Sequence, residues 1–155
     1  MRGSMANKIL SAIRANNLRP ESICIEMTES GFMDMTPCFC SFRKKLDENN
    51  IQFIIDDFGT GYSNLMNISN LEPDIVKLDR GFTLKALSRS YEYQLMQYVI
   101  EMVHKLNQYV CVEGVETKED LEKIKALGPD LIQGYYYSKP CSRDEFLKKF
   151  FCYSE

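Results

Sequence analysis

Residues 52–57 read Gln-Phe-Ile-Ile-Asp-Asp, a continuous apolar run that ends in two consecutive acidic residues. Apolar runs without strict alternation are typical of parallel strands that are covered on both faces. We therefore predict a strand over Gln52–Asp56, with Asp56 and Asp57 at its carboxyl end. This pattern of an apolar run closed by acidic residues recurs along the chain.

The same kind of run predicts four further strands, and longer helical patterns separate them. The predicted strands are Ser22–Met27, Ile75–Leu78, Tyr109–Glu113 and Leu131–Gly134. The predicted helices are Lys8–Asn17, Phe39–Asn49, Tyr91–Asn107, Lys118–Leu127 and Arg143–Phe151. A helix followed by about five β-α units, joined by right-handed crossovers, indicates an α/β fold. We expect a parallel sheet or part of a TIM-type (β/α) barrel.

Local signals mark where several of these helices begin and end. Thr36-Pro37 places a capping hydroxyl ahead of a proline at the first helical position. Thr117–Asp120 approximates a capping box and Ser142–Glu145 matches one. Gly128 follows Leu127, where a left-handed residue ends a helix.

Length and charge bound the domain organisation and the partners. A chain of 155 residues is about one domain, and we place that domain at residues 7–155. Residues 1–6, Met-Arg-Gly-Ser-Met-Ala, resemble an expression-vector leader. The net charge of -3 argues against DNA binding by counterion release. We expect no membrane segment, because no apolar run is long enough to span a bilayer.

The cysteines and the single histidine do not indicate a catalytic centre. Six cysteines include no CxxC pair, and four of them lie in apolar segments, so we expect free, buried thiols in a reducing cytoplasm. Cys38 and Cys40 are too close together for a zinc knuckle. His104 lies in a helical pattern and is predicted at a solvated position.

Acidic or amide residues lie at or just beyond the carboxyl end of every predicted strand. Any one of them has an ordinary alternative as a helix N-cap or a solvated turn residue. Five successive strands that end this way favour a site, because the carboxyl ends of parallel strands meet at one edge. The acidic or amide residues are Glu26, Glu29, Asp56, Asp57, Asp79, Glu113, Glu116 and Gln133, and one lysine, Lys77, lies in the third predicted strand.

The chemistry of this set points to a divalent cation. Carboxylate oxygens suit magnesium, manganese or calcium better than zinc. Several carboxylates with one lysine, Lys77, indicate metal-assisted attack of water on a phosphate ester.

Residues 57–63, Asp-Phe-Gly-Thr-Gly-Tyr-Ser, form a glycine-rich segment after the second predicted strand. The segment lacks the lysine of a phosphate-binding P-loop. Glycine spacing alone leaves two interpretations open, a mobile active-site loop and an ordinary tight turn.

Five motifs, in order, resemble those of the EAL family of cyclic di-GMP phosphodiesterases. Residues 25–30 (IEMTES) are similar to the family's LExTES element, and residues 56–65 (DDFGTGYSNL) to its DDFGTGYSSL loop. Residues 73–79 (PDIVKLD), 112–117 (VEGVET) and 133–140 (QGYYYSKP) resemble the remaining three. The matches extend from Ile23 to Pro140.

The resemblance implies a role for each matching position. Glu26, Asp56, Asp57 and Glu113 would be metal ligands, and Lys77 and Glu113 would act on the attacking water. Glu29 would anchor the Asp57–Leu65 loop, which carries the family's dimer contact. Gln133 and Glu116 would orient water or substrate. The implied reaction hydrolyses cyclic di-GMP to pGpG with two ions of Mg²⁺ or Mn²⁺.

One departure from the family pattern changes the expected activity. The E-A-L element and a metal-binding asparagine precede residues 25–30 in the family, and this sequence shows neither upstream of Glu26. We therefore expect the C-terminal portion of the barrel without about three N-terminal strands, weakened metal binding and slow hydrolysis. A homodimer would cover the open edges. The alternatives are an inactive EAL-derived module that binds cyclic di-GMP or a protein, and an unrelated TIM-barrel enzyme.

Overall fold

The computed structural model describes residues 5–28, 37–60 and 65–151. In these ranges five strands alternate with seven α-helices, and a short 3-10 helix covers Pro20–Ser22. The strands are β1 (Cys24–Thr28), β2 (Gln52–Phe58), β3 (Ile75–Leu78), β4 (Tyr109–Glu113) and β5 (Leu131–Gln133). The helices are α1 (Met5–Ala15), α2 (Pro37–Asp47), α3 (Leu65–Leu71), α4 (Arg80–Ser88), α5 (Ser90–Lys105), α6 (Lys118–Lys125) and α7 (Arg143–Phe151).

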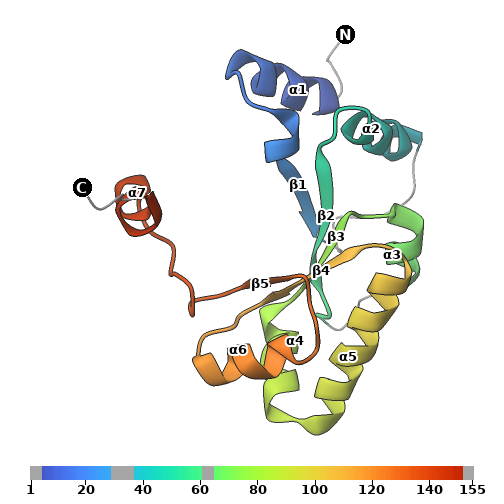
Figure 1. The fold of residues 1–155 in the computed structure, drawn as a ribbon. Helices are drawn as coiled ribbons and strands as arrows, with labels where there is room; N and C mark the ends of the chain where they lie inside the picture. The colour runs from blue at the N-terminus through green and yellow to red at the C-terminus, as the bar shows by residue number, and fades with distance from the viewer. Residues whose placement is uncertain (1–4, 29–36, 61–64, 152–155) are drawn as a thin grey trace.

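The five strands form one parallel sheet in the order β1-β2-β3-β4-β5, so each strand pairs with the next one along the chain (Figure 1). In register, Glu26 lies beside Ile54, Ile54 beside Ile75, and Ile75 beside Tyr109. Helices cross from each strand to the next, as parallel pairing requires. The α/β fold with five parallel strands is therefore confirmed.

One face of the sheet is covered by helices and forms the core. Val76 and Leu78 point to this face and are fully buried, together with Val110 on β4 and Ile100 on α5. A second cluster packs α1 and α2 against β2, through Ile13, Leu46, Phe53 and Ile55 among others. Figure 1 shows these helices on the outer side of a curved sheet.

The opposite face has little cover from the described residues. Ile54, Ile75 and Cys111 form a small apolar cluster there. Two large side chains in the same register, Tyr109 and Leu131, are 56% and 47% exposed. Because side chains alternate along a strand, the polar residues two positions beyond this cluster lie on the same open face.

Most of the predicted helix-boundary signals are present in the structure, although the predicted cap Thr36 lies outside the described residues. Helix α2 begins at Pro37, and Thr117 caps α6 in a reciprocal pair with Asp120. The backbone N–H of Ser142 donates to Glu145, and that of Glu145 donates to Ser142 Oγ, so the second capping box is also formed. Gly128 has a φ of 74°, the left-handed conformation expected after α6.

Helix α4 was not predicted as an element of its own. Asp79, read from the sequence as one of the acidic residues after a strand, is its N-cap and accepts hydrogen bonds from the backbone N–H groups of Gly81 and Phe82. The sequence of α4, Arg-Gly-Phe-Thr-Leu-Lys-Ala-Leu-Ser, includes a glycine and a β-branched residue, so it carries a weak helical signal.

The expectation of buried thiols is wrong for four cysteines. Among the described residues Cys111 is buried, whereas Cys24, Cys38, Cys40 and Cys141 are exposed, and all five are free. Cys24 lies on β1 in register with Gln52 on the open face, so its apolar neighbours in sequence do not bury it.

Two further expectations concern α1 and α5. Met5 and Ala6 belong to α1, where Ala6 is fully buried, and the origin of residues 1–6 as an expression leader stays a prediction. His104 is in α5, partly solvated as predicted, with Nε2 2.9 Å from Asp130 Oδ2.

No described helix combines the length and apolar character needed to cross a bilayer.

Candidate functional site: a lysine among three carboxylates

Four of the predicted site residues meet at the carboxyl end of the sheet. Glu26 lies on β1, Asp56 on β2, Lys77 on β3 and Glu113 on β4, each on the open face. Because β1 to β4 are consecutive neighbours in a parallel sheet, residues at equivalent ends of the strands come together. These four side chains therefore meet at the edge of the sheet that the sequence predicted.

The ammonium of Lys77 is the centre of this group, which we call the Lys77 cluster: Glu26, Asp56, Lys77 and Glu113. Lys77 Nζ lies 2.6 Å from Glu113 Oε1, 3.0 Å from Glu26 Oε2 and 3.1 Å from Asp56 Oδ1. Lys77 itself is only 7% exposed. The three carboxylates are more accessible, at 44% for Glu26, 22% for Asp56 and 18% for Glu113.

The surroundings of Lys77 fix its charge. Burial alone would lower the pKa of the ammonium, but hydrogen bonds to Glu113, Glu26 and Asp56 outweigh burial and raise the pKa above its ordinary value of 10.5. Lys77 therefore stays protonated at neutral pH. It can donate hydrogen bonds and supply positive charge, and it cannot accept a proton from water.

A buried thiol lies beside the cluster. Cys111 is the register partner of Lys77 on β4. Burial, and then the nearby charge of Glu113, raises the pKa of the Cys111 thiol to about 11. The thiol is thus neutral at physiological pH when no metal ion is bound, and the donors in this group that suit a hard cation are the carboxylate oxygens.

The donor set fits a hard divalent cation in its chemistry. Three carboxylates from three strands supply oxygen ligands, which magnesium and manganese prefer. Within the described residues, however, no three His, Cys, Asp or Glu side chains are arranged to hold a metal ion as they stand. Lys77 Nζ lies between the three carboxylates and compensates their charge.

Asp57 follows Asp56 but does not join the cluster. The pairing of β2 with β3 shifts between Ile55 and Phe58, and Asp57 has a left-handed φ of 59°. Its backbone N–H donates to Asp56 Oδ1 at 3.0 Å. This irregularity interrupts the alternation of side chains at Asp57, and the hydrogen bond from the Asp57 N–H restrains the Asp56 carboxylate.

Gln133 and Glu116 lie next to the Lys77 cluster. Gln133 is the register partner of Glu113 and is exposed on the same face. Glu116 instead accepts hydrogen bonds from Arg80 Nε and Nη2 at 3.2 and 2.7 Å. Arg80 is not among the site residues that the sequence predicts. Glu29 and residues 61–64 of the Asp57–Leu65 loop lie outside the described residues, so their predicted roles stay predictions.

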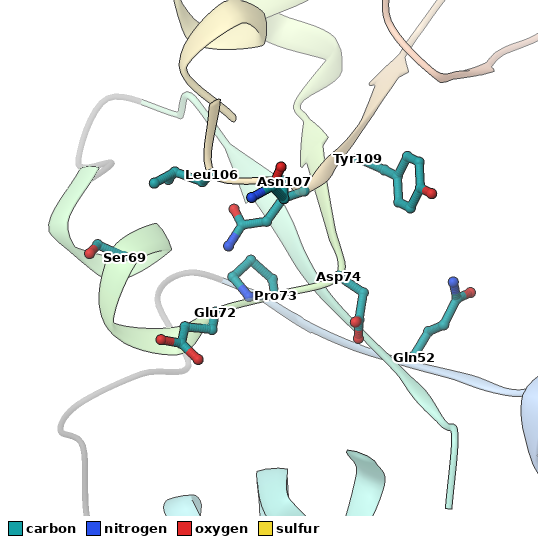
Figure 2. A pocket seen from close by; sticks show the side chains of 9 residues that line it. Gln52, Ser69, Glu72, Pro73, Asp74, Leu106, Asn107 and Tyr109 are labelled. Atoms are coloured by element: carbon teal, nitrogen blue, oxygen red, sulfur yellow. The ribbon is translucent and has the colours of Figure 1, made fainter. Parts of the chain in front are cut away.

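A cavity of about 400 Å³ lies at the other end of the sheet, between the segments that precede β3 and β4. Figure 2 shows Asp74, Gln52 and Tyr109 around it, with Asn107 and Pro73 from the two segments. Asp74 Oδ2 accepts from the backbone N–H of Phe53 at 2.7 Å and pairs with Arg43. Since this carboxylate is already engaged in structural contacts, we place the functional site at the Lys77 cluster.

Comparison with known families decides the classification. The EAL domain family matches residues 1–140. The chain belongs to the EAL family. The resemblance to this family is confirmed, and so is the barrel-type α/β fold.

Relatives and solved structures of EAL proteins agree. The chain is 31% identical to the cyclic di-GMP phosphodiesterase NbdA of Pseudomonas aeruginosa over 152 residues, which cover 96% of this chain and 19% of that protein. The structure of the EAL enzyme Bd1971 with cAMP and cyclic di-GMP matches with a TM-score of 0.88 at 29% identity, over 96% of this chain and 39% of that one.

A third comparison includes a metal ion. The manganese and cyclic di-GMP complex of Klebsiella pneumoniae BlrP1 at pH 9.0 matches with a TM-score of 0.80 at 30% identity. The match covers 87% of this chain and 34% of BlrP1. The chain thus spans a minor part of the length of each of these three proteins.

Proposed function

We propose that this EAL chain supplies one side of a metal-dependent phosphodiesterase centre that hydrolyses cyclic di-GMP to linear pGpG. The observation that carries the proposal is the convergence of Glu26, Asp56 and Glu113 on the buried ammonium of Lys77. Similarity to NbdA and to the cyclic di-GMP complexes of Bd1971 and BlrP1 supports the choice of substrate.

The carboxylates of Glu26, Asp56 and Glu113 would hold Mg²⁺ or Mn²⁺, with Asp57 near a second ion. Bound divalent cations supply positive charge that stabilises a phosphate under attack. The metals are expected to bind weakly here, because Lys77 Nζ lies between the three carboxylates and, within the described residues, no three acidic side chains are arranged to hold an ion as they stand.

Lys77 and Glu113 would divide the work on the attacking water. Lys77 remains an ammonium, so it donates a hydrogen bond to the water or to a phosphoryl oxygen. Glu113, the nearest carboxylate to Lys77 Nζ, would accept the proton that the water loses as it adds to phosphorus. One P–O ester bond then breaks, and the ring opens to the linear dinucleotide.

The test measures hydrolysis and binding separately. Cyclic di-GMP is incubated with the chain in Mg²⁺ or Mn²⁺ and pGpG is quantified, while calorimetry measures cyclic di-GMP binding with and without metal. We expect slow, metal-dependent formation of pGpG. Glu113→Gln should lower the rate by about 100-fold or more, whereas the exposed Glu122→Gln on α6 should leave it unchanged.

Two outcomes would contradict parts of this proposal. Turnover as fast as that of a complete EAL domain would refute the expected impairment. Tight cyclic di-GMP binding without any pGpG would favour the alternative function, an EAL-derived binding module.

We also propose a homodimer. In the described residues β1 and β5 each have a neighbouring strand on one side only, so both are edge strands. Association of two copies would cover them. Size-exclusion chromatography with light scattering tests this, and a monomer at micromolar concentration would refute it.

A further inference from the structure

Arg80, the first residue of α4, connects the two chain segments that carry Lys77 and Glu113. Its Nε and Nη2 donate to Glu116 Oε1 at 3.2 and 2.7 Å. Arg80 follows Lys77 by three residues, and Glu116 follows Glu113 by three residues. Two ion pairs therefore run side by side between the same two segments, the buried Lys77–Glu113 pair and the more exposed Arg80–Glu116 pair.

Arg80 also supports the backbone directly after Glu113. A Cβ atom placed on Gly114 would lie 2.4 Å from Arg80 Cγ and 3.1 Å from Arg80 Cα. Gly114 has a φ of 80°, which L-residues rarely adopt. The aliphatic part of Arg80 thus packs against the Gly114 backbone, and its guanidinium holds Glu116, two residues further on.

Arg80 is itself held by its own segment. The backbone N–H of Asp79 donates to Phe58 O at 2.9 Å. The Asp79 carboxylate accepts from the N–H groups of Gly81 at 2.6 Å and Phe82 at 3.3 Å. These hydrogen bonds connect the start of α4 to the end of β2, so they restrain the backbone of Arg80.

The same helical turn contacts the neighbouring strand end. A Cβ atom on Gly59 would lie 2.7 Å from Phe82 Cδ1, so the backbone that follows β2 rests on Phe82. The first turn of α4 therefore lies between the segments after β2 and β4, which lead from Asp56 and Glu113.

We propose that Arg80 is a positioning residue that holds the 114–116 turn so that Glu113 reaches Lys77. The expected effect of Arg80 on hydrolysis rests on the proposed phosphodiesterase function. The expected effect of Arg80 on the position of Glu113 does not. The side chains of Arg80 and Glu116 are 57% and 38% exposed, and ion pairs this exposed contribute little to stability. Removing the pair should therefore cost little stability, so that a change at Glu113 can be measured in a folded chain.

The first experiment reads the position of Glu113 without any activity. In protein with ¹⁵N-labelled lysine, the buried and hydrogen-bonded Lys77 ammonium should give a signal protected from exchange, assigned through Lys77→Arg. Arg80→Ala and Glu116→Gln should each shift or broaden this signal. Arg80→Lys, which keeps the charge and the aliphatic stem over Gly114, should restore part of it.

The second experiment measures hydrolysis of cyclic di-GMP in Mn²⁺. Displacing a catalytic group by about 1 Å lowers rates by about 100-fold. We expect Arg80→Ala to lower kcat by roughly 10- to 100-fold with little change in KM, and Arg80→Lys to recover most of that loss.

Arg89→Ala is the matched control, because Arg89 pairs with Glu92 at 3.1 Å and is 69% exposed at the start of α5. The proposal is overturned if the Lys77 signal is unchanged in both Arg80→Ala and Glu116→Gln, or if Arg89→Ala alters it equally. A changed signal in a chain that produces no pGpG would support the positioning role and refute the phosphodiesterase function.

Discussion

The two ends of the sheet use their carboxylates differently. At the amino end, Asp74 and Asp130 each come directly before a strand. At the carboxyl end, Glu26, Asp56 and Glu113 each lie within a different strand. Asp74 Oδ2 accepts from Phe53 N at 2.7 Å and pairs with Arg43 of α2. Asp130 Oδ2 accepts from Val110 N at 2.8 Å and pairs with His104 of α5. Both bind the backbone of the preceding strand and a basic side chain of the helix that comes before that strand.

The carboxylates at the other end are arranged differently. Glu26, Asp56 and Glu113 all contact one side chain, Lys77, and remain partly exposed on the open face. Carboxylates bound to backbone amides fix the register of the strands. Carboxylates gathered around one ammonium can exchange partners, because breaking their contacts leaves the strand ladder intact.

The largest effect should follow from Lys77→Met. Removing the ammonium leaves three neighbouring carboxylates without their shared cation, which should destabilise the fold by roughly 1–3 kcal/mol and abolish hydrolysis. Mn²⁺ should then raise the thermal midpoint of Lys77→Met more than that of the wild type. An equal Mn²⁺ shift in both proteins would contradict the idea that Lys77 compensates an exchangeable cation site.

At the amino end, Asp74→Ala should affect stability without affecting the Lys77 cluster. The variant removes the acceptor of the Phe53 N–H and a partner of Arg43, which should cost about 1–3 kcal/mol in urea unfolding. Asp74→Asn, whose amide oxygen can still accept, is the control and should lose less. A folded Asp74→Ala that loses hydrolysis as completely as Lys77→Met would break the distinction between the two ends.

Acid unfolding should sharpen the same distinction at Asp130. Burial alone would raise the pKa of this carboxyl, but hydrogen bonds from Val110 N–H and His104 lower it below its ordinary value of 3.8. A lowered folded-state pKa stabilises the protein above pH 3.8, and this contribution is lost as pH falls through the folded-state value.

Urea midpoints of wild type and Asp130→Asn, measured between neutral pH and the acid limit, test this sign. The advantage of the wild type should shrink as the pH falls below 3.8. An advantage that grows as the pH falls below 3.8 would contradict the assignment.

The smallest effect is expected at Lys123, which belongs to neither end. Lys123 Nζ lies 2.8 Å from Glu119 Oε1 within α6, and both side chains are largely exposed. Lys123→Ala should change the free energy of unfolding by less than about 0.5 kcal/mol. A larger loss would show that exposed pairs matter more here than the comparison assumes.

The sequence predicted the strands well because each is an apolar run with a polar residue at its carboxyl end. The bounds of β3 and β4 were predicted to the residue, and β5 ends one residue early, at Gln133. Helix α4 was missed because its cap, Asp79, resembles the other acidic residues that follow strands. An acidic residue is a helix cap when backbone N–H groups of the following turn lie within hydrogen-bond distance of its carboxylate. The conformation of that turn decides this, and the sequence does not show it.

The site was predicted in part for a related reason. Alternation along a strand places Glu26, Asp56, Lys77 and Glu113 on one face, so their meeting follows from the pattern. The left-handed backbone at Asp57 breaks the alternation, and no sequence signal marks it. Arg80 was missed because its role depends on the close approach of the Gly114 backbone across two separate segments.

The aspartate contacts at the amino end bear on how the sheet assembles as the chain is synthesised. Phe53 and Asp74 are 21 residues apart, and Val110 and Asp130 are 20 residues apart. Each contact closes a short loop of one strand and one crossover, and loops of this length cost little chain entropy. Each strand can therefore dock on the strand made just before it, without waiting for distant parts of the chain, and the sheet can grow in the order of translation.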